Sequence, residues 1–285
     1  MPELPEVQAL SEFLDASLTG ERVARAEMRS VAALKTFDPP LDALQDTVIK
    51  GVSRAGKFID IRAGSMHLVV HLARAGWLRL RPEATKTRTA MRGPLMMVLL
   101  LEDGAVLEAT EQGTEKRLAV YLVRSIEDVP GVVRLGPDAL SNQLTADRLG
   151  EVLAGRTETL KSALADQAVI AGIGNAYSDE ILHAARLSPF RKAASLTSDE
   201  TATLRQAMQD VLNDALDRAR AADPAQLRVD KKRRMRVHGR TGERCNVCGD
   251  IIREVSFASR SFQYCPTCQT GGKVYADRRM SRLLR

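Results

Sequence analysis

The stretch CNVCGDIIREVSFASRSFQYCPTC, residues 245–268, contains every cysteine of the 285-residue chain. It holds two Cys-x-x-Cys pairs, Cys245/Cys248 and Cys265/Cys268, with sixteen residues between them. This spacing is typical of sites in which four thiolates surround one tetrahedral zinc ion; a redox-active pair and a site without metal are the alternatives. We predict one structural zinc ion and no organic cofactor. The metal supplies much of the folding free energy, because so short a segment buries little apolar surface.

The residues between the two pairs have strand-like halves around the sequence ASRS, which predicts a hairpin with Arg260 near its tip. The same region is basic. From residue 228 to residue 285 there are fifteen Lys and Arg against five Asp and Glu, whereas the upstream part has 27 bases and 31 acids. This distribution favours a polyanion as partner; a solvated charged surface is the alternative. Because many zinc ribbons bind no nucleic acid, the finger alone does not establish DNA binding.

Upstream, the chain opens with MPELPEVQAL, in which prolines and acids at the first turn followed by apolar residues at helical spacing predict a helix that ends near Gly20. Short apolar runs separated by turn residues then predict an antiparallel β-sandwich closed by this helix. A helical pattern covers residues 143–222, with a capping box at Thr197 and Glu200. The basic segment 222–237 reads as a linker. The apolar runs that predict the strands of the sandwich are 67–72, 77–81, 95–102, 105–110 and 118–123.

The composition excludes several classes of protein. Hydrophobic residues make up 44% of the chain, too many for a disordered protein. There is no apolar run of 18 residues, and the acidic start lacks the features of a signal peptide. We therefore expect a protein of the cytoplasm that does not contact membranes, with cysteines kept reduced.

A glycine-rich turn, Gly172-Ile-Gly174-Asn175, lies between two helical stretches. Backbone N–H groups at a turn that enters a helix can hold a phosphate, and an asparagine amide adds a donor. The alternative is an ordinary helix–helix turn with asparagine as the cap.

Four features occur together in one order along the chain: PELPE at the start, GKF with Lys57, GIGN with Asn175, and the four-cysteine finger with Arg260. Together they resemble the formamidopyrimidine-DNA glycosylase/endonuclease VIII family, whose members repair oxidised DNA bases. The resemblance covers almost the whole chain. It implies an α+β multidomain fold: an N-terminal helix plus antiparallel β-sandwich over 1–135, a helix–two-turn–helix domain over 136–228, and a basic linker with a zinc-finger β-hairpin over 229–285.

The resemblance also implies catalytic roles. Removal of Met1 leaves Pro2 with a free secondary amine that attacks the sugar C1′ of a damaged nucleotide, and the resulting Schiff base allows strand cleavage by β,δ-elimination. Glu3 matches the catalytic carboxylate, with Glu6 as a supporting acid. Lys57 and Arg260 complete the catalytic group. The residues implied to bind DNA are His71, Arg74, Arg117, Leu118, Lys161 and Asn175; for Lys57 and Lys161 alone, a solvated surface lysine is the alternative.

The departures from the family pattern concern the lesion. Arg74 stands in HLARAG where many members have a methionine, and Arg117-Leu118 replaces an arginine–phenylalanine wedge. His238 stands where tyrosine is frequent. The segment before the finger lacks the glycine-containing loop that covers 8-oxoguanine in purine-specific members. We therefore expect a preference for abasic sites, oxidised pyrimidines or ring-opened products.

The sequence thus predicts a monomeric DNA glycosylase/AP lyase acting on double-stranded DNA with a damaged base or an abasic site. A non-catalytic protein that binds damaged DNA or DNA junctions on the same fold is the alternative. A zinc-ribbon transcription factor is a third reading, but it has no need of Pro2-Glu3.

Overall fold

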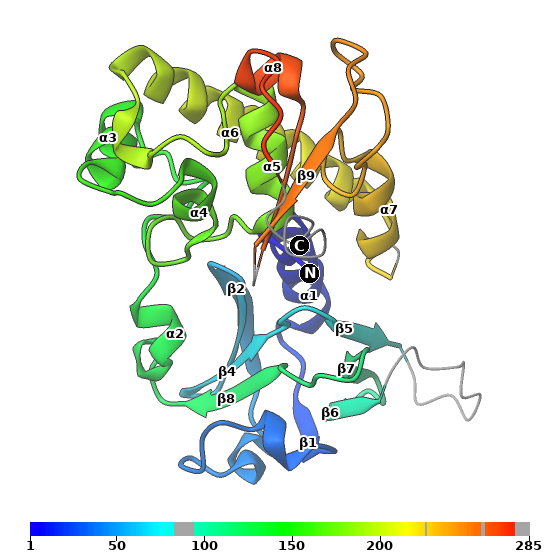
Figure 1. The fold of residues 1–285 in the computed structure, drawn as a ribbon. Helices are drawn as coiled ribbons and strands as arrows, with labels where there is room; N and C mark the ends of the chain where they lie inside the picture. The colour runs from blue at the N-terminus through cyan, green and yellow to red at the C-terminus, as the bar shows by residue number, and fades with distance from the viewer. Residues whose placement is uncertain (83–93, 226, 258–259, 277–285) are drawn as a thin grey trace, which may run out of the picture. The chain divides into compact units, whose positions relative to one another are not determined.

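A computed structural model describes residues 1–82, 94–225, 227–257 and 260–276 (Figure 1). The chain divides into two compact units. The first contains Met1–Arg134 and Ala219–Arg228, and the second contains Leu135–Arg218 and Val229–Arg285. The zinc-finger segment therefore belongs to the same unit as the helical segment that precedes it.

Helix α1, Leu4–Leu18, starts the first unit. Glu3 and Glu6 form a capping box, and Pro5 lies in the first turn, where no N–H is needed. Val7, Leu10 and further leucines of α1 are buried in the core of the unit. The sequence-based helix is confirmed.

Two four-stranded antiparallel sheets form the body of this unit (Figure 1). Their strand orders are β1-β6-β7-β5 and β2-β3-β4-β8, and the residues buried between them make one hydrophobic cluster that includes the apolar face of α1. The predicted sandwich is thus confirmed, although β1, β2 and β3 were not identified from the sequence. The bounds are β1 Val23–Met28, β2 Ile49–Ala55, β3 Phe58–Ala63, β4 Met66–His71, β5 Gly76–Arg81, β6 Leu95–Leu101, β7 Val106–Glu111 and β8 Ala119–Val123, with short helices η1 Val31–Ala33, η2 Leu41–Leu44, η3 Ile126–Asp128 and α2 Pro130–Val133.

The second unit is mainly helical. The Thr197 N–H donates to Glu200 at 2.9 Å and the Glu200 N–H to the Thr197 hydroxyl at 3.3 Å, which confirms the predicted capping box at the start of α6. Leu204, Met208 and Leu212 of this helix are buried, as its period predicts. The helices are α3 Ala146–Leu153, α4 Leu160–Ala165, α5 Asn175–Ala184, η4 Ala193–Ser195 and α6 Ser198–Ala221, whose last three residues belong to the first unit.

The segment predicted as a linker contains a helix, α7, Leu227–Arg234, which corrects that prediction. Lys231 Nζ lies 4.3 Å from the centroid of the Tyr177 ring, and this cation–π contact holds the basic helix in the unit. The finger follows as strands β9 Arg253–Ser256 and β10 Ser261–Tyr264, paired antiparallel, and helix α8 Pro266–Thr270. The predicted hairpin is confirmed.

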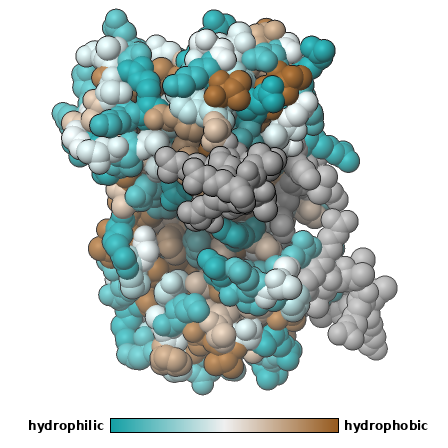
Figure 2. Space-filling view, in the orientation of Figure 1, coloured by the Kyte–Doolittle hydropathy of each residue, from teal (hydrophilic) through white to brown (hydrophobic). Residues whose placement is uncertain are grey.

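The surface in Figure 2 is mostly hydrophilic, with scattered hydrophobic residues in both units, as is normal for a globular protein. Among the described residues, no helix is long and apolar enough to span a bilayer.

Candidate functional site

The amino end of α1 carries two buried carboxylates. Glu3 is 1% exposed and Glu6 is 3% exposed, and Glu6 Oε2 accepts a hydrogen bond from the Glu3 N–H at 2.9 Å. The positive end of the helix dipole stabilises negative charge here. Pro2, which precedes Glu3, is also buried, while Met1 is exposed. A proline nitrogen is therefore followed by a carboxylate able to transfer a proton.

Lys57 occupies the two-residue turn between β2 and β3 and is only 6% exposed. The turn is tight because Gly56 adopts φ +56°, which a side chain would disfavour. Arg54 donates to Gln8 of α1 at 2.8 Å and to the Gly56 carbonyl at 2.9 Å. Arg54, which sequence reasoning missed, thus ties the turn that carries Lys57 to helix α1.

His71 ends β4 directly opposite Phe58 of β3, with ring centroids 4.6 Å apart. Burial, and then the positive charge of Lys57, lower the pKa of His71 to about 4. The imidazole is consequently neutral at pH 7, and it offers hydrogen-bonding nitrogens instead of a second cation next to Lys57.

Arg74 is exposed in the turn between β4 and β5. Arg117 and Leu118 lie in the loop before β8, where the buried Glu111 carboxylate accepts hydrogen bonds from both of their N–H groups at 2.9–3.0 Å. The Arg117 side chain is 62% exposed, but Leu118 is 1% exposed and belongs to the core cluster. Leu118 is thus packed in the core in this conformation, and its use as a gap filler stays a prediction. Glu111 was another residue that sequence reasoning missed.

In the second unit, Asn175 is the first residue of α5. Gln167 braces the turn before it by donating to the Ile173 carbonyl at 2.6 Å and accepting from the Gly172 N–H at 3.0 Å. Gly172 has φ +99°, so the predicted glycine turn is real. Asn175 Oδ1 is buried and has no hydrogen-bond partner within the described part of the chain. The amide is thus held at the amino end of α5.

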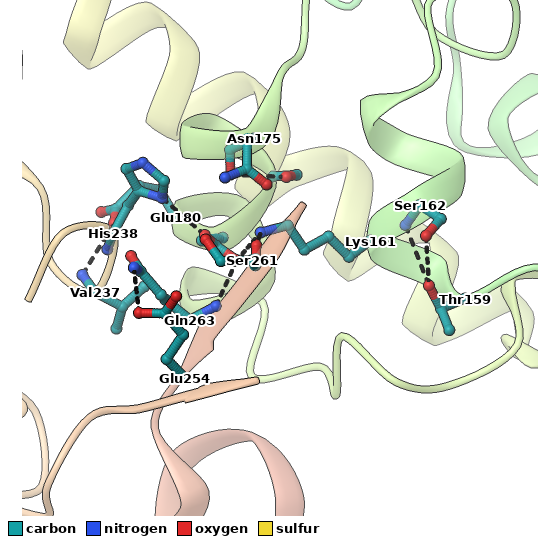
Figure 3. Close-up of polar contacts among 12 residues, drawn as sticks. Thr159, Lys161, Ser162, Asn175, Glu180, Val237, His238, Glu254, Ser261 and Gln263 are labelled. Carbon is teal, nitrogen blue, oxygen red and sulfur yellow. Dashed lines mark hydrogen bonds and ion pairs between the residues drawn. The ribbon is translucent and has the colours of Figure 1, made fainter. Parts of the chain in front are cut away.

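Lys161 lies on α4 (Figure 3). Its side chain is fully buried. Its Nζ donates to Asp179 Oδ1 and to the Ser261 carbonyl, both at 2.5 Å. A direct DNA contact by Lys161 is therefore not available in this conformation. Beside Asp179, the Glu180 carboxylate accepts from the backbone N–H groups of residues 236, 237 and 238 at 2.7–2.9 Å. The sequence offered a signal for this pair, since two adjacent acids directly precede the apolar Ile181 and Leu182 in α5.

Arg260 directly precedes β10 and is half-buried. Its carbonyl accepts from the Phe257 N–H at 2.8 Å, and its Nη1 donates to the Ser162 carbonyl at 3.2 Å. The structure thus brings Arg260 and Lys161 together through neighbouring residues of α4 and β10.

The four cysteine sulfurs all lie within 4.8 Å of one another, with Cys248 and Cys265 at 3.3 Å and Cys245 and Cys268 at 3.9 Å. Four thiolates about 2.3 Å from one tetrahedral ion require separations of this size, so the donor set fits zinc. Burial raises the pKa of Cys265, and it raises the pKa of Cys268 to about 11, so bound metal has to displace protons there. His183 Nε2 of α5 lies 3.3 Å from Cys245 Sγ and connects the helix to the site. The predicted zinc site is confirmed.

Three family models match this chain. They are the formamidopyrimidine-DNA glycosylase N-terminal domain over residues 1–118, the formamidopyrimidine-DNA glycosylase H2TH domain over residues 135–223, and the zinc finger found in FPG and IleRS over residues 242–271. The chain belongs to the formamidopyrimidine-DNA glycosylase family, as the sequence motifs predicted.

Individual relatives support the same family assignment. The formamidopyrimidine-DNA glycosylase of Symbiobacterium thermophilum is 36% identical over 277 residues, which cover 94% of this chain and 89% of the relative. A formamidopyrimidine-DNA glycosylase-like protein of Mycobacterium tuberculosis is 57% identical over 151 residues, 53% of this chain and 94% of that protein. The structure of Lactococcus lactis Fpg in complex with DNA that contains an oxidised pyrimidine matches with a TM-score of 0.81 at 25% identity, covering 94% of this chain and 100% of that one.

Proposed function

We propose that this protein is a DNA glycosylase with AP lyase activity that removes oxidised bases from double-stranded DNA and cuts the strand at the resulting site. The observation that carries the proposal is Pro2-Glu3 at the amino end of α1 in a member of this family. The names of the relatives and the damaged DNA bound to Lactococcus lactis Fpg support the substrate class.

The chemistry begins at the Pro2 nitrogen once Met1 has been removed. An α-amino group titrates near 7.7–8, well below a lysine, so a useful fraction is unprotonated at neutral pH. Its lone pair forms a bond to C1′ while the bond between C1′ and the base breaks, and the departing base takes up a proton. The nitrogen then loses its proton, the C1′–O4′ bond of the sugar ring breaks and O4′ takes up a proton. The iminium that results makes the C2′ hydrogen acidic. Loss of that proton expels the 3′ phosphate, and a second elimination expels the 5′ phosphate.

The other residues hold the substrate and move protons. Glu3 transfers the proton at the sugar, and Glu6, which accepts a hydrogen bond from the Glu3 backbone, keeps this carboxylate in place. Lys57, neutral His71, the Asn175 amide and Arg260 bind phosphates around the lesion. Arg74 and Arg117, both exposed, replace the rotated nucleotide in the stack.

The test is borohydride trapping on duplex DNA with one abasic site. Protein whose N-terminal mass shows that Met1 has been removed is expected to give a covalent adduct, because borohydride reduces the iminium. Glu3→Gln is expected to lower base excision about 10²- to 10⁴-fold, the usual range for a lost proton-transfer group.

Pro5→Ala is the matched control, since it changes a proline of the same turn that has no terminal amine. A correctly processed protein that shifts the duplex in a salt-dependent manner but forms no adduct contradicts the enzyme proposal. That result identifies the alternative, a non-catalytic protein that binds damaged DNA.

A further inference from the structure

The buried ion pair between Lys161 and Asp179 is unusual in its connections to the zinc-finger hairpin. Both side chains are 0% exposed. The backbone carbonyl of Ser261, the residue after Arg260, accepts from Lys161 Nζ, and the Gln263 N–H donates to Asp179 Oδ1 at 3.2 Å. Residues 261 and 263 lie on the same edge of β10, so the ion pair holds the strand directly after Arg260 by hydrogen bonds to its backbone. Figure 3 shows Lys161 and Ser261 side by side.

A second contact runs parallel to the first. Arg260 Nη1 binds the carbonyl of Ser162, the neighbour of Lys161 on α4. The Phe262 ring, between the two gripped residues of β10, lies 5.1 Å from Lys161 Nζ and stacks near Phe190. Adjacent residues of α4 therefore hold adjacent residues of the hairpin, one through its backbone and one through its guanidinium.

The remaining oxygen of Asp179 extends the connection. Asp179 Oδ2 lies 2.9 Å from His238 Nδ1, and the backbone of residues 236–238 is held by Glu180. One carboxylate on α5 thus joins α4, β10 and the segment that enters the finger. The zinc site lies at the other end of this finger, because β10 runs from Ser261 to Tyr264 and Cys265 follows.

We propose that Lys161 and Asp179 are positioning residues for Arg260: they fix the start of β10 so that the Arg260 guanidinium meets a DNA phosphate, and Lys161 itself does not touch DNA. The proposal rests on the proposed function only in taking DNA as the ligand. It assigns the placement of the finger arginine to a charged pair in the helical part of the unit, in addition to zinc.

The test is a thermodynamic cycle on DNA affinity. Lys161→Met alone removes the ammonium partner of the buried Asp179 carboxylate and is expected to destabilise the unit strongly, so the working variant is Lys161→Met/Asp179→Asn, in which the pair is neutral and similar in volume. Zinc content and a cooperative thermal transition establish that it folds. Arg260→Ala is then introduced into the wild type and into this variant, and binding to a duplex with one tetrahydrofuran abasic analogue is measured over a range of salt concentrations.

If Lys161 acts through Arg260, Arg260→Ala weakens binding about tenfold in the wild type and less than about twofold in the double variant. The slope of log affinity against log salt falls by about one phosphate contact in Arg260→Ala and in Lys161→Met/Asp179→Asn. It falls no further in the triple variant that combines them. Arg205→Met is the matched control, because Arg205 is also buried but, among the residues that the structure describes, donates only to the carbonyls of Ala139 and Ser141. It is expected to leave the tenfold effect of Arg260→Ala intact.

A full tenfold effect of Arg260→Ala in the double variant, or a slope that falls by two contacts in the triple variant, overturns the proposal. The same cycle on undamaged duplex separates the two proposals, since phosphate contacts do not require a lesion. If Arg260→Ala and the double variant are coupled on undamaged duplex but no borohydride adduct forms, the positioning role is supported and the enzyme proposal is contradicted. If the protein binds neither the damaged nor the undamaged duplex, both proposals are contradicted.

Discussion

At the scale of single residues, polar side chains hold the backbone beside two groups of candidate DNA contacts and in the segment before the finger. Glu111 holds the N–H groups of Arg117 and Leu118, Gln167 holds the turn before Asn175, and Glu180 holds residues 236–238. Hydrogen bonds to an ionised carboxylate are among the stronger ones in proteins, about 1.5–3 kcal/mol. The side chains at these three places therefore project from a backbone that hydrogen bonds hold in position.

His71 provides a test at this scale. Its pKa is about 4 in the folded protein and about 6.5 in the unfolded chain, so the unfolded chain binds more protons between these values. The free energy of unfolding is thus expected to fall as the pH decreases from about 6.5 to about 4. His71→Gln is expected to show a smaller loss between pH 7 and pH 5 in urea denaturation. Equal losses in both proteins contradict the low pKa; the similar shift of His183 is present in both and cancels.

At the scale of elements, the finger depends on metal. Around the cysteines, the hydrophobic cluster consists of Val237, Ile252, Cys245 and Cys265, so little apolar surface holds the metal-binding end of the finger. Cys265→Ser is expected to abolish zinc binding and the fold of this segment, and to weaken DNA binding for every sequence. Thr267→Ala, between the two ligands of the same pair, is expected to retain zinc. Retained zinc in the Cys265→Ser protein, measured by chelator titration, is the result that contradicts a four-cysteine site.

The same element predicts a pH effect. Burial raises the pKa values of Cys265 and Cys268 in the metal-free finger, so zinc competes with protons for these thiolates. Zinc affinity is expected to fall as the pH decreases. A zinc affinity independent of pH between 8 and 6 contradicts this expectation.

At the scale of the whole molecule, we expect lesion choice to follow from the residues that surround the rotated base. From the resemblance, we expect Arg74 to take the place of a methionine and the segment before the finger to enclose a purine less well; in the structure this segment contains α7. Single-turnover excision on duplexes with one lesion each is expected to be faster for oxidised pyrimidines, ring-opened purines and abasic sites than for 8-oxoguanine opposite cytosine. The reverse order contradicts this preference and leaves the glycosylase proposal intact.

Local patterns in the sequence were sufficient for the zinc site, the sandwich strands from residue 67 onward, the capping box of α6 and the family, because ligand spacing and apolar periodicity depend on residues close in the chain. Strand β1 escaped because its pairing partner β6 lies far along the sequence. Strands β2 and β3 pair with each other across a two-residue turn, and they escaped because charged residues and a glycine interrupt their apolar pattern. Tertiary structure alone decided the positions of Leu118 and Lys161. Both resembled surface residues of a DNA site, yet packing against distant strands buries Leu118, and Asp179 with the Ser261 carbonyl, 100 residues away, buries Lys161. Burial and charge pairing are properties of contacts between distant residues, and a linear pattern does not contain them.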